Sequence, residues 1–370
     1  MIQIIENVRF IQDGTMVFGD IYLVDGFVER IYYKTLKGPS DLVIPGFVDL
    51  HIHGYHNYNC ESTNPHDIHK MAVAMAKRGI VGFCPTITPR PYALIEKMIE
   101  AYHSAFMTSG QFARFLGFHL EGPYLSEKRL GAIDPTQIRE IDLDELETFL
   151  HKYHEDIAIM SIAPECVNGI EAIEMLNRYG VIASIGHSNA TYEECMDAFA
   201  HGVRHVTHLG NAMSEANHRQ ATMSDAIFNH NNVKCELICD GVHNDKRHLQ
   251  WLIPMLGFDR VMVISDGTRQ CGMKYADQHQ FKDGSIVVKD AIYKEGILMG
   301  STKDILDDLP LLYEEFEYSI DDIIKMTSIN AMKSLNESDS TISLGKKVDL
   351  IVLDQHLKLK EVYINGNIVK

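Results

Sequence analysis

The sequence is short of positive charge and contains no long apolar run. Its 370 residues include 34 Lys and Arg against 51 Asp and Glu, a formal net charge of -17. Nucleic acids and anionic membranes are bound through concentrated Lys and Arg, so this balance argues against both as partners. No stretch approaches the roughly 18 apolar residues of a membrane-spanning helix, and the first residues lack the basic region of a signal peptide. We therefore expect a cytoplasmic protein.

Cysteine is present, but not in the pattern of a disulfide framework. The seven cysteines are odd in number and dispersed along the chain. Disulfide frameworks belong to small secreted domains, so we interpret these residues as reduced thiols of the core. With 45% hydrophobic and 23% charged residues, the composition is that of a globular protein. The unusual number is 19 His, against a single Trp.

Both ends of the chain alternate short apolar runs with turn signals. Asp13-Gly14 and Asp25-Gly26 separate such runs near the start, and Asn365-Gly366 does so near the end. Asp-Gly and Asn-Gly between alternating hydrophobic residues are strong hairpin signals. A few strands at each end are too few for a stable sheet. We therefore predict that residues 1–44 and 341–370 combine into one small β-sandwich domain.

Residues 45–340 follow a different pattern, in which apolar strands alternate with amphipathic helices. Eight strands separated by helices give a parallel sheet, and eight is the number that closes a (β/α)8 TIM barrel, an α/β fold. The predicted strands are 42–53, 79–86, 115–121, 157–164, 181–187, 205–209, 233–239 and 261–265. The predicted helices include 65–78, 91–107, 169–179, 191–201, 245–256, 302–316 and 320–335.

Polar residues end several of these strands, where barrels of this kind carry their functional groups. His51 and His53 end the first strand, and alternate residues point to the same side, so both imidazoles can face one point. Strands three, five, six and eight end in Glu121, His187, His208 and Asp266. Zinc and similar ions favour imidazole and carboxylate ligands. The convergence predicts a catalytic metal site.

The same residues carry a resemblance to a known family. Segments such as His119-Leu120-Glu121-Gly122-Pro123 and Thr207 to Met213 resemble those of the N-acetylglucosamine-6-phosphate deacetylases, in the amidohydrolase superfamily. The resemblance implies that Glu121, His187 and His208 hold one divalent ion. His51 and His53 make a second ion plausible, with Glu121 bridging. Zinc is the first expectation, and iron, manganese and cobalt are alternatives.

The resemblance also implies a reaction and a set of substrate contacts. Asp266 would take a proton from the attacking water and deliver it to the leaving amine of the sugar. The substrate would be a small amino-sugar phosphate. Family members are commonly homodimers, so Arg219 serves either its own or the neighbouring subunit. The residues expected at the substrate are Ala132, Asn211, Ala212, Arg219, His243, Met299 and Gly300.

Two departures from the family pattern leave alternatives open. Ile133 stands where the family usually has a His that helps to polarise the substrate carbonyl, and loss of such a donor costs roughly 100- to 1000-fold in rate. A second ion could take over that role, or the substrate could differ. Arg269 stands where the family has smaller, apolar residues and either contacts substrate or is solvated. The alternatives are an amidohydrolase acting on another N-acyl substrate and a catalytically weak sugar-phosphate binder.

Overall fold

The computed structural model describes residues 2–36, 38–108 and 110–369. Eight parallel strands form most of a barrel, paired in the order β15-β14-β13-β12-β11-β10-β8-β5. The ring closes at the mouth, where the Asp266 amide donates to the His51 carbonyl at 3.0 Å. The predicted (β/α)8 class is confirmed. The barrel strands are β5 (Phe47–Ile52), β8 (Ile80–Ile87), β10 (Phe118–Glu121), β11 (Ile157–Ile162), β12 (Ile182–Ile185), β13 (His205–Val206), β14 (Lys234–Ile238) and β15 (Val261–Ile264).

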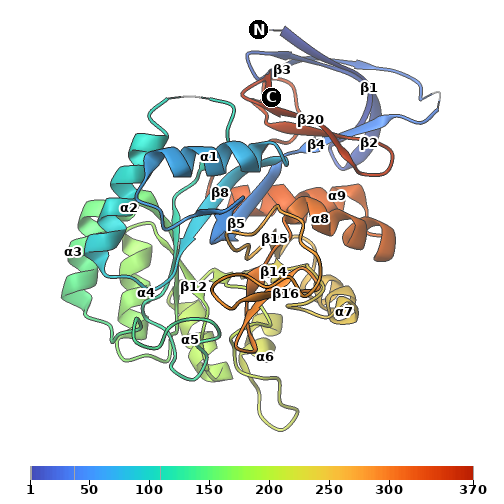
Figure 1. Cartoon of the computed structure of the whole chain (residues 1–370). Helices are drawn as coiled ribbons and strands as arrows, with labels where there is room; N and C mark the ends of the chain where they lie inside the picture. Colours follow the sequence, from blue (N-terminus) through green and yellow to red (C-terminus); the bar gives the residue numbers. More distant parts are fainter. Residues whose placement is uncertain (1, 37, 109, 370) are drawn as a thin grey trace.

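Helices surround these strands (Figure 1). Their N-termini are capped as the sequence allows: Asn64 accepts from the His66 amide at α1, and Thr191 and Glu194 form a capping box at α5. The helix predicted over 302–316 begins only at Ile305 and ends in a π-helical turn, Leu311–Glu315. The helices are α1 (Pro65–Ala76), α2 (Tyr92–Ala105), α3 (Leu143–Tyr153), α4 (Gly169–Arg178), α5 (Tyr192–Ala200), α6 (Met223–Asn229), α7 (Lys246–Leu256), α8 (Ile305–Pro310), α9 (Ile320–Ile324) and α10 (Asn330–Ser334).

Both ends of the chain share a second sheet, which lies apart from the barrel strands in Figure 1. Its order is β21-β20-β19-β4-β1-β2-β3, so N-terminal β4 pairs with C-terminal β19. The Val28 amide also donates to the Lys346 carbonyl at 2.9 Å, which joins the two ends of the chain a second time. The sheet has its own apolar core, which includes Phe10, Ile21 and Leu350. The strands are β1 (Ile2–Gln12), β2 (Thr15–Val24), β3 (Phe27–Tyr33), β4 (Asp41–Pro45), β19 (Leu350–Leu353), β20 (Leu359–Ile364) and β21 (Asn367–Ile368).

The hairpin predictions for this sheet are confirmed. Asp13-Gly14 joins β1 to β2, with φ of 50° and 72°, and Asp25-Gly26 joins β2 to β3, with φ of 50° and 86°. Asn365-Gly366 joins β20 to β21 with φ of 52° and 73°. Two successive residues of positive φ are the requirement of the hairpin turn that matches strand twist, and Asp, Asn and Gly meet it at the least cost.

The first predicted strand, 42–53, is wrong as one element, because the chain changes sheets at Gly46. β4 belongs to the terminal sheet and β5 to the barrel. A Cβ atom on Gly46 would come within 2.2 Å of Val81, so the two segments can meet here only without a side chain. This crossing places β5, and with it His51 and His53, at the start of the barrel.

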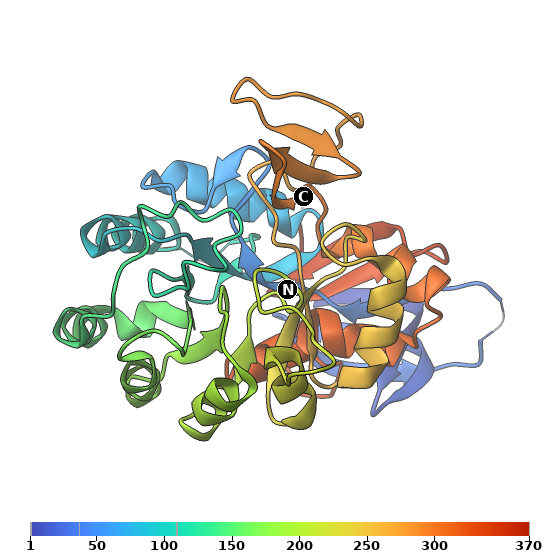
Figure 2. The ribbon, with the colours of Figure 1, turned by 90° about the horizontal axis from the view of Figure 1, so that it is seen from below.

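After the last barrel strand the chain forms a small antiparallel sheet of β16 (Ile286–Val288), β17 (Ala291–Lys294) and β18 (Ile297–Ser301). Figure 2 shows it, in orange, projecting beyond the helices. Short strands complete the barrel loops: β6 (Gly54–Tyr55), β7 (Tyr58–Asn59) and β9 (Arg114–Phe115). All seven cysteines are free. Within the described ranges, no helix is both long and apolar enough to cross a bilayer.

Candidate metal centre

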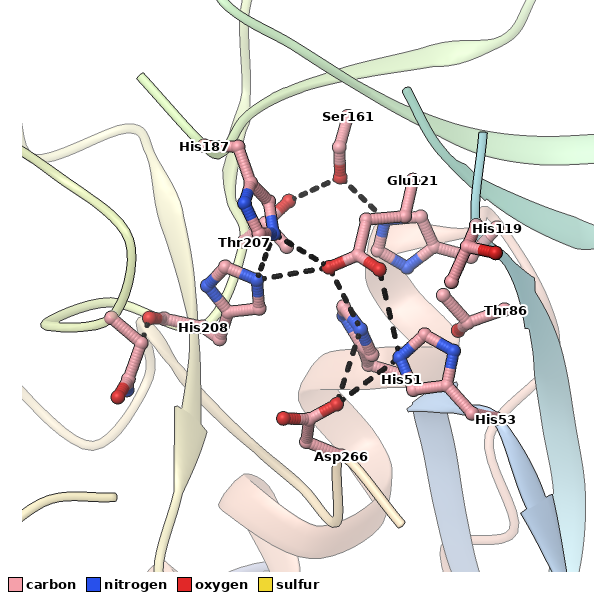
Figure 3. Close-up of polar contacts among 12 residues, drawn as sticks. His51, His53, Thr86, His119, Glu121, Ser161, His187, Thr207, His208 and Asp266 are labelled. Carbon is pink, nitrogen blue, oxygen red and sulfur yellow. Dashed lines mark hydrogen bonds and ion pairs between the residues drawn. The ribbon is translucent and has the colours of Figure 1, made fainter. Parts of the chain in front are cut away.

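Six residues that the sequence predicts at the ends of five barrel strands meet at the mouth of the barrel (Figure 3). Glu121, the last residue of β10, lies at their centre. His187 and His208 follow β12 and β13 on one side of it. The other side is occupied by His51, His53 and Asp266. We call these six residues the mouth cluster.

One half of the mouth cluster consists of Glu121, His187 and His208. The Nε2 atoms of His187 and His208 lie 2.9 and 3.1 Å from Glu121 Oε1, and 3.1 Å from each other. The His187 Nδ1 atom lies 3.0 Å from the Arg129 carbonyl, which can only accept. Nδ1 therefore carries the proton of neutral His187, and the lone pair of Nε2 points to the centre of the group.

The other half joins His51 and His53 to Asp266. The His53 and His51 Nε2 atoms lie 3.2 and 3.6 Å from Asp266 Oδ1. They also lie 3.6 and 3.5 Å from the two oxygens of Glu121, which therefore touches both halves. The His51 Nε2 atom is buried and has no hydrogen-bond partner.

The donor set fits divalent ions. Ligand atoms that share an ion at about 2.0 to 2.2 Å stand roughly 3 to 3.5 Å from one another. The distances in each half fall close to that range. Buried imidazole nitrogens are left facing carboxylates, and an orphaned Nε2 such as that of His51 is costly unless something binds it. The histidines and carboxylates of the mouth cluster therefore form candidate ligand groups for a metal ion.

The backbone is strained where these ligands stand. His187, His208 and Asp266 have φ of 46°, 30° and 47°, in the left-handed region that residues with side chains rarely adopt. Such strain is of order 1–3 kcal/mol per residue and persists only where the surrounding structure enforces it. It turns the three side chains off their strands and toward Glu121.

Charge in the mouth cluster favours ionised carboxylates. Burial alone would raise the pKa of Glu121, but the imidazoles of His51 and His187 outweigh it and hold that pKa well below its usual range. Burial is likewise outweighed at Asp266, where His53, His51 and His243 lower the pKa to about 2. Asp266 is therefore a carboxylate at neutral pH and can accept a proton.

The mouth cluster opens into a cleft of about 520 Å³. Five predicted substrate residues line it, from three loops and from β18: Ala132, Asn211, Ala212, His243 and Met299. His243 is held on its inner side, where its Nδ1 atom lies 2.7 Å from Asp240, while its Nε2 atom lies 3.5 Å from Asp266. Ile133 lines the cleft too, and so does Arg269, which pairs with Asp283 at 3.3 Å.

Two predicted substrate residues stand elsewhere. Gly300 supports the centre from behind, since a Cβ atom there would come within 2.7 Å of the Asp266 carbonyl. Arg219 is not among the described residues that line the cleft. It lies exposed, with His218, in the segment between β13 and α6. Its contact with substrate, in its own or the neighbouring subunit, stays a prediction.

A second layer of polar side chains lies beneath the mouth cluster, sealed inside the barrel. His119 bonds at both nitrogens, to the Leu50 carbonyl at 3.0 Å and to Ser161 at 2.7 Å. Ser161 continues to Thr207 at 2.7 Å. Glu236, on β14, accepts from His51. We call this group, with Ser184 and His205, the inner layer; its members are His119, Ser161, Ser184, His205, Thr207 and Glu236, each at most 2% exposed.

Sequence reasoning missed Glu236 and His119 as parts of the site. The signal for Glu236 is an acidic residue inside the otherwise apolar run of the seventh strand, a place where charge is rare unless it is paired. It also missed the Arg90 and Glu61 pair on the cleft wall, whose shortest contact is 2.7 Å. That pair joins two loops that the sequence does not place side by side.

Known proteins resemble this chain over nearly its whole length. The model of the amidohydrolase family matches residues 42–369. An N-acetylglucosamine-6-phosphate deacetylase of Bacillus subtilis is 30% identical over 91% of this chain and 87% of its own. An N-acetylgalactosamine-6-phosphate deacetylase of Escherichia coli O157:H7 is 26% identical over 96% of both chains. The solved N-acetylglucosamine-6-phosphate deacetylase of Thermotoga maritima, 25% identical, superposes with a TM-score of 0.88 over 100% of this chain and 99% of that one.

Proposed function

The chain belongs to the amidohydrolase family and, within it, to the N-acetylglucosamine-6-phosphate deacetylases, and from that premise we propose that it removes acetate from N-acetyl-D-glucosamine 6-phosphate. The products are acetate and D-glucosamine 6-phosphate, as in amino-sugar catabolism. The observation that carries the proposal is the mouth cluster itself, in which four imidazoles and two carboxylates converge beside a cleft.

We propose that Glu121, His187 and His208 would hold one divalent ion and that His51, His53 and Glu121 would hold a second. Zinc suits imidazole and carboxylate ligands best, and iron, manganese and cobalt are alternatives. An ion held there would supply a water of lowered pKa and an electrophile for the amide carbonyl. The strained strand ends at His187 and His208 keep the ligands in place before the ion arrives.

Asp266 carries the proton in this proposal. Its carboxylate accepts a proton from the attacking water as the new C–O bond forms, and delivers it to the sugar nitrogen as the C–N bond breaks. Asp266 is ionised, and its Oδ1 atom lies 3.2 Å from His53, so it borders the residues that would hold the ion. His243, at 3.5 Å from Asp266, is positioned to orient both the carboxylate and the sugar.

The phosphate is the part of the substrate that a chain of net charge -17 must bind through a few local donors. We propose that Asn211, the Ala212 backbone and His243 bind the phosphate from the subunit's own cleft. Ala132 and Met299, which line the same cleft, contact the rest of the substrate, and Gly300 stands behind Asp266. Arg219 then reaches the cleft of the neighbouring subunit in a cytoplasmic homodimer, where its guanidinium can fork onto phosphate oxygens. Its exposed position outside its own cleft supports this assignment.

A second candidate substrate is N-acetylgalactosamine 6-phosphate. Ile133 and Arg269 on the cleft wall favour a pocket that differs from the family pattern, and one relative carries that substrate in its name. The two candidate sugars differ only in the configuration of the carbon that carries one hydroxyl group.

The experiment is an acetate-release assay with protein whose metal content is measured in the same sample. The substrates are the 6-phosphates of N-acetylglucosamine, N-acetylgalactosamine and N-acetylmannosamine. We expect the highest kcat/KM with the first and loss of all turnover on treatment with a chelator. Failure of fully metallated protein to release acetate from any of the three would refute the proposal.

A further inference from the structure

Glu236 is the one carboxylate of the inner layer, and it contacts ligands from both halves of the mouth cluster. We propose that Glu236 is a positioning residue that holds His51 and His208 in the conformations in which they bind metal. This inference rests on the proposed function only in that the mouth cluster binds divalent ions.

The first contact fixes which nitrogen of His51 faces the metal. The His51 Nδ1 atom lies 3.1 Å from Glu236 Oε2, and both side chains are fully buried. A carboxylate accepts and does not donate, so the proton of neutral His51 sits on Nδ1. The lone pair then belongs to Nε2, the atom that faces Glu121 and Asp266 and has no other partner. A carboxylate on the far nitrogen also raises the basicity of a metal-binding imidazole.

The second contact holds the turn that carries His208. The same oxygen, Glu236 Oε2, accepts from the His208 amide at 3.3 Å, and the Glu236 carbonyl accepts from the Leu209 amide at 2.9 Å. The backbone of His208 is strained, with φ of 30°. A segment in this conformation needs outside support, and Glu236 supplies it from both its side chain and its main chain.

The cost of Glu236 argues that it is kept for the metal. Among the described residues, the side chains that pair with its carboxylate are imidazoles only, His51 at 3.1 Å and His119 at 3.7 Å. Burial of a carboxylate that has no Lys or Arg partner costs free energy. The imidazoles of His119 and His51 offset that cost and lower the pKa of Glu236. Both ring nitrogens of His119 already bond to the Leu50 carbonyl and to Ser161, so neither is free to bond to Glu236.

The test is the zinc affinity of Glu236→Gln, measured by competition with a chelating dye. Glutamine keeps an acceptor oxygen and the shape of the side chain but removes the charge. We expect zinc to bind about 10- to 100-fold more weakly, the range for loss of an outer partner of a metal-binding histidine. The metal-free variant should remain folded, so that the weaker zinc affinity is not the result of a lost fold.

Ser184→Ala is the matched control, because Ser184 belongs to the inner layer but bonds to Thr207 and to no member of the mouth cluster. Its zinc affinity should stay within about threefold of wild type, well below the effect of losing an outer partner of a metal-binding histidine. Zinc affinity of Glu236→Gln within the same limit overturns the inference. If Glu236→Gln does not fold, Glu236→Asp takes its place, because its shorter side chain withdraws the oxygen from His51. Zinc binding that is about 10- to 100-fold weaker then supports the inference, and binding within about threefold of wild type overturns it. An inactive wild type that binds zinc would refute the deacetylase proposal and leave this measurement standing.

Discussion

The mouth cluster and the inner layer are built from similar residue types, yet their atoms are arranged in opposite ways. In the mouth cluster, side chains such as His53 and Asp266 are 20% and 14% exposed and border a cleft. The nitrogens of its histidines converge on carboxylate oxygens. In the inner layer, His119 and Glu236 are fully buried, and both nitrogens of His119 already have partners in the protein.

The difference shows how a binding histidine is told from a supporting one. A histidine whose second nitrogen is fixed by an acceptor, as His187 is by Arg129 and His51 by Glu236, presents its other nitrogen as a ligand. One with both nitrogens bonded cannot. Loss of a mouth residue should therefore abolish chemistry, whereas loss of an inner residue should weaken the support or the fold.

The largest expected effect is at Asp266. Asp266→Asn keeps the size of the side chain and removes the proton acceptor, so kcat should fall roughly 1000-fold, within the range for general acid–base groups. Zinc content and substrate binding should stay close to wild type. Assays of acetate release and metal content check this. Asp259→Asn, on the exposed surface, is the control; equal kcat in wild type and Asp266→Asn would remove the proposed role.

The second-largest expected effect is the loss of stability at low pH, through the histidines of the inner layer. Burial lowers the pKa of His119 and of His205 to about 4, from 6.5 in the unfolded chain. Between those values the unfolded state binds more protons, so the free energy of unfolding falls as pH drops from about 6.5 to about 4, by up to roughly 3 kcal/mol for each histidine. Urea unfolding of metal-free protein across this range measures the loss.

His205→Leu separates one of these histidines from the rest. Its unfolding free energy should depend less steeply on pH, by about one proton, over the same interval. An unchanged slope would show that His205 is protonated in the folded protein.

The next expected effect concerns phosphate binding by Arg219. Arg219→Met should raise KM for the phosphorylated substrate about 10- to 100-fold, because a hydrogen bond to a charged group contributes about 1.5–3 kcal/mol. Zinc content should not change. Arg178→Met, at an arginine 65% exposed on α4, is the matched control. If both variants have the KM of wild type, Arg219 does not bind phosphate in either subunit.

The smallest expected effect is at Thr207, between Ser161 and Ser184. Thr207→Val keeps the shape and leaves two buried hydroxyls with one partner fewer, so the free energy of unfolding should fall by about 1–3 kcal/mol. Metal content should be that of wild type. A loss of zinc together with unchanged stability would contradict the division between the two layers.

The sequence predicts much of this arrangement, because strand ends can be read from local pattern. Apolar runs that end in His187, His208 and Asp266 place those residues at one rim of a barrel. The Asp-Gly and Asn-Gly pairs predict the hairpins of the terminal sheet. The inner layer could not be predicted, because the contact between His51 and Glu236 joins residues 185 positions apart and depends on barrel register. Nor could the break at Gly46, where the residue needed is set by Val81 on another strand.

The measurement that tests the central claim most directly is anomalous diffraction at the zinc edge from crystals grown with zinc. We predict a peak within about 2.0 to 2.2 Å of Glu121, His187 and His208, with a second, where present, beside His51 and His53. The inner layer should show none. A zinc peak between His119 and Glu236, with none at the mouth cluster, would contradict the account.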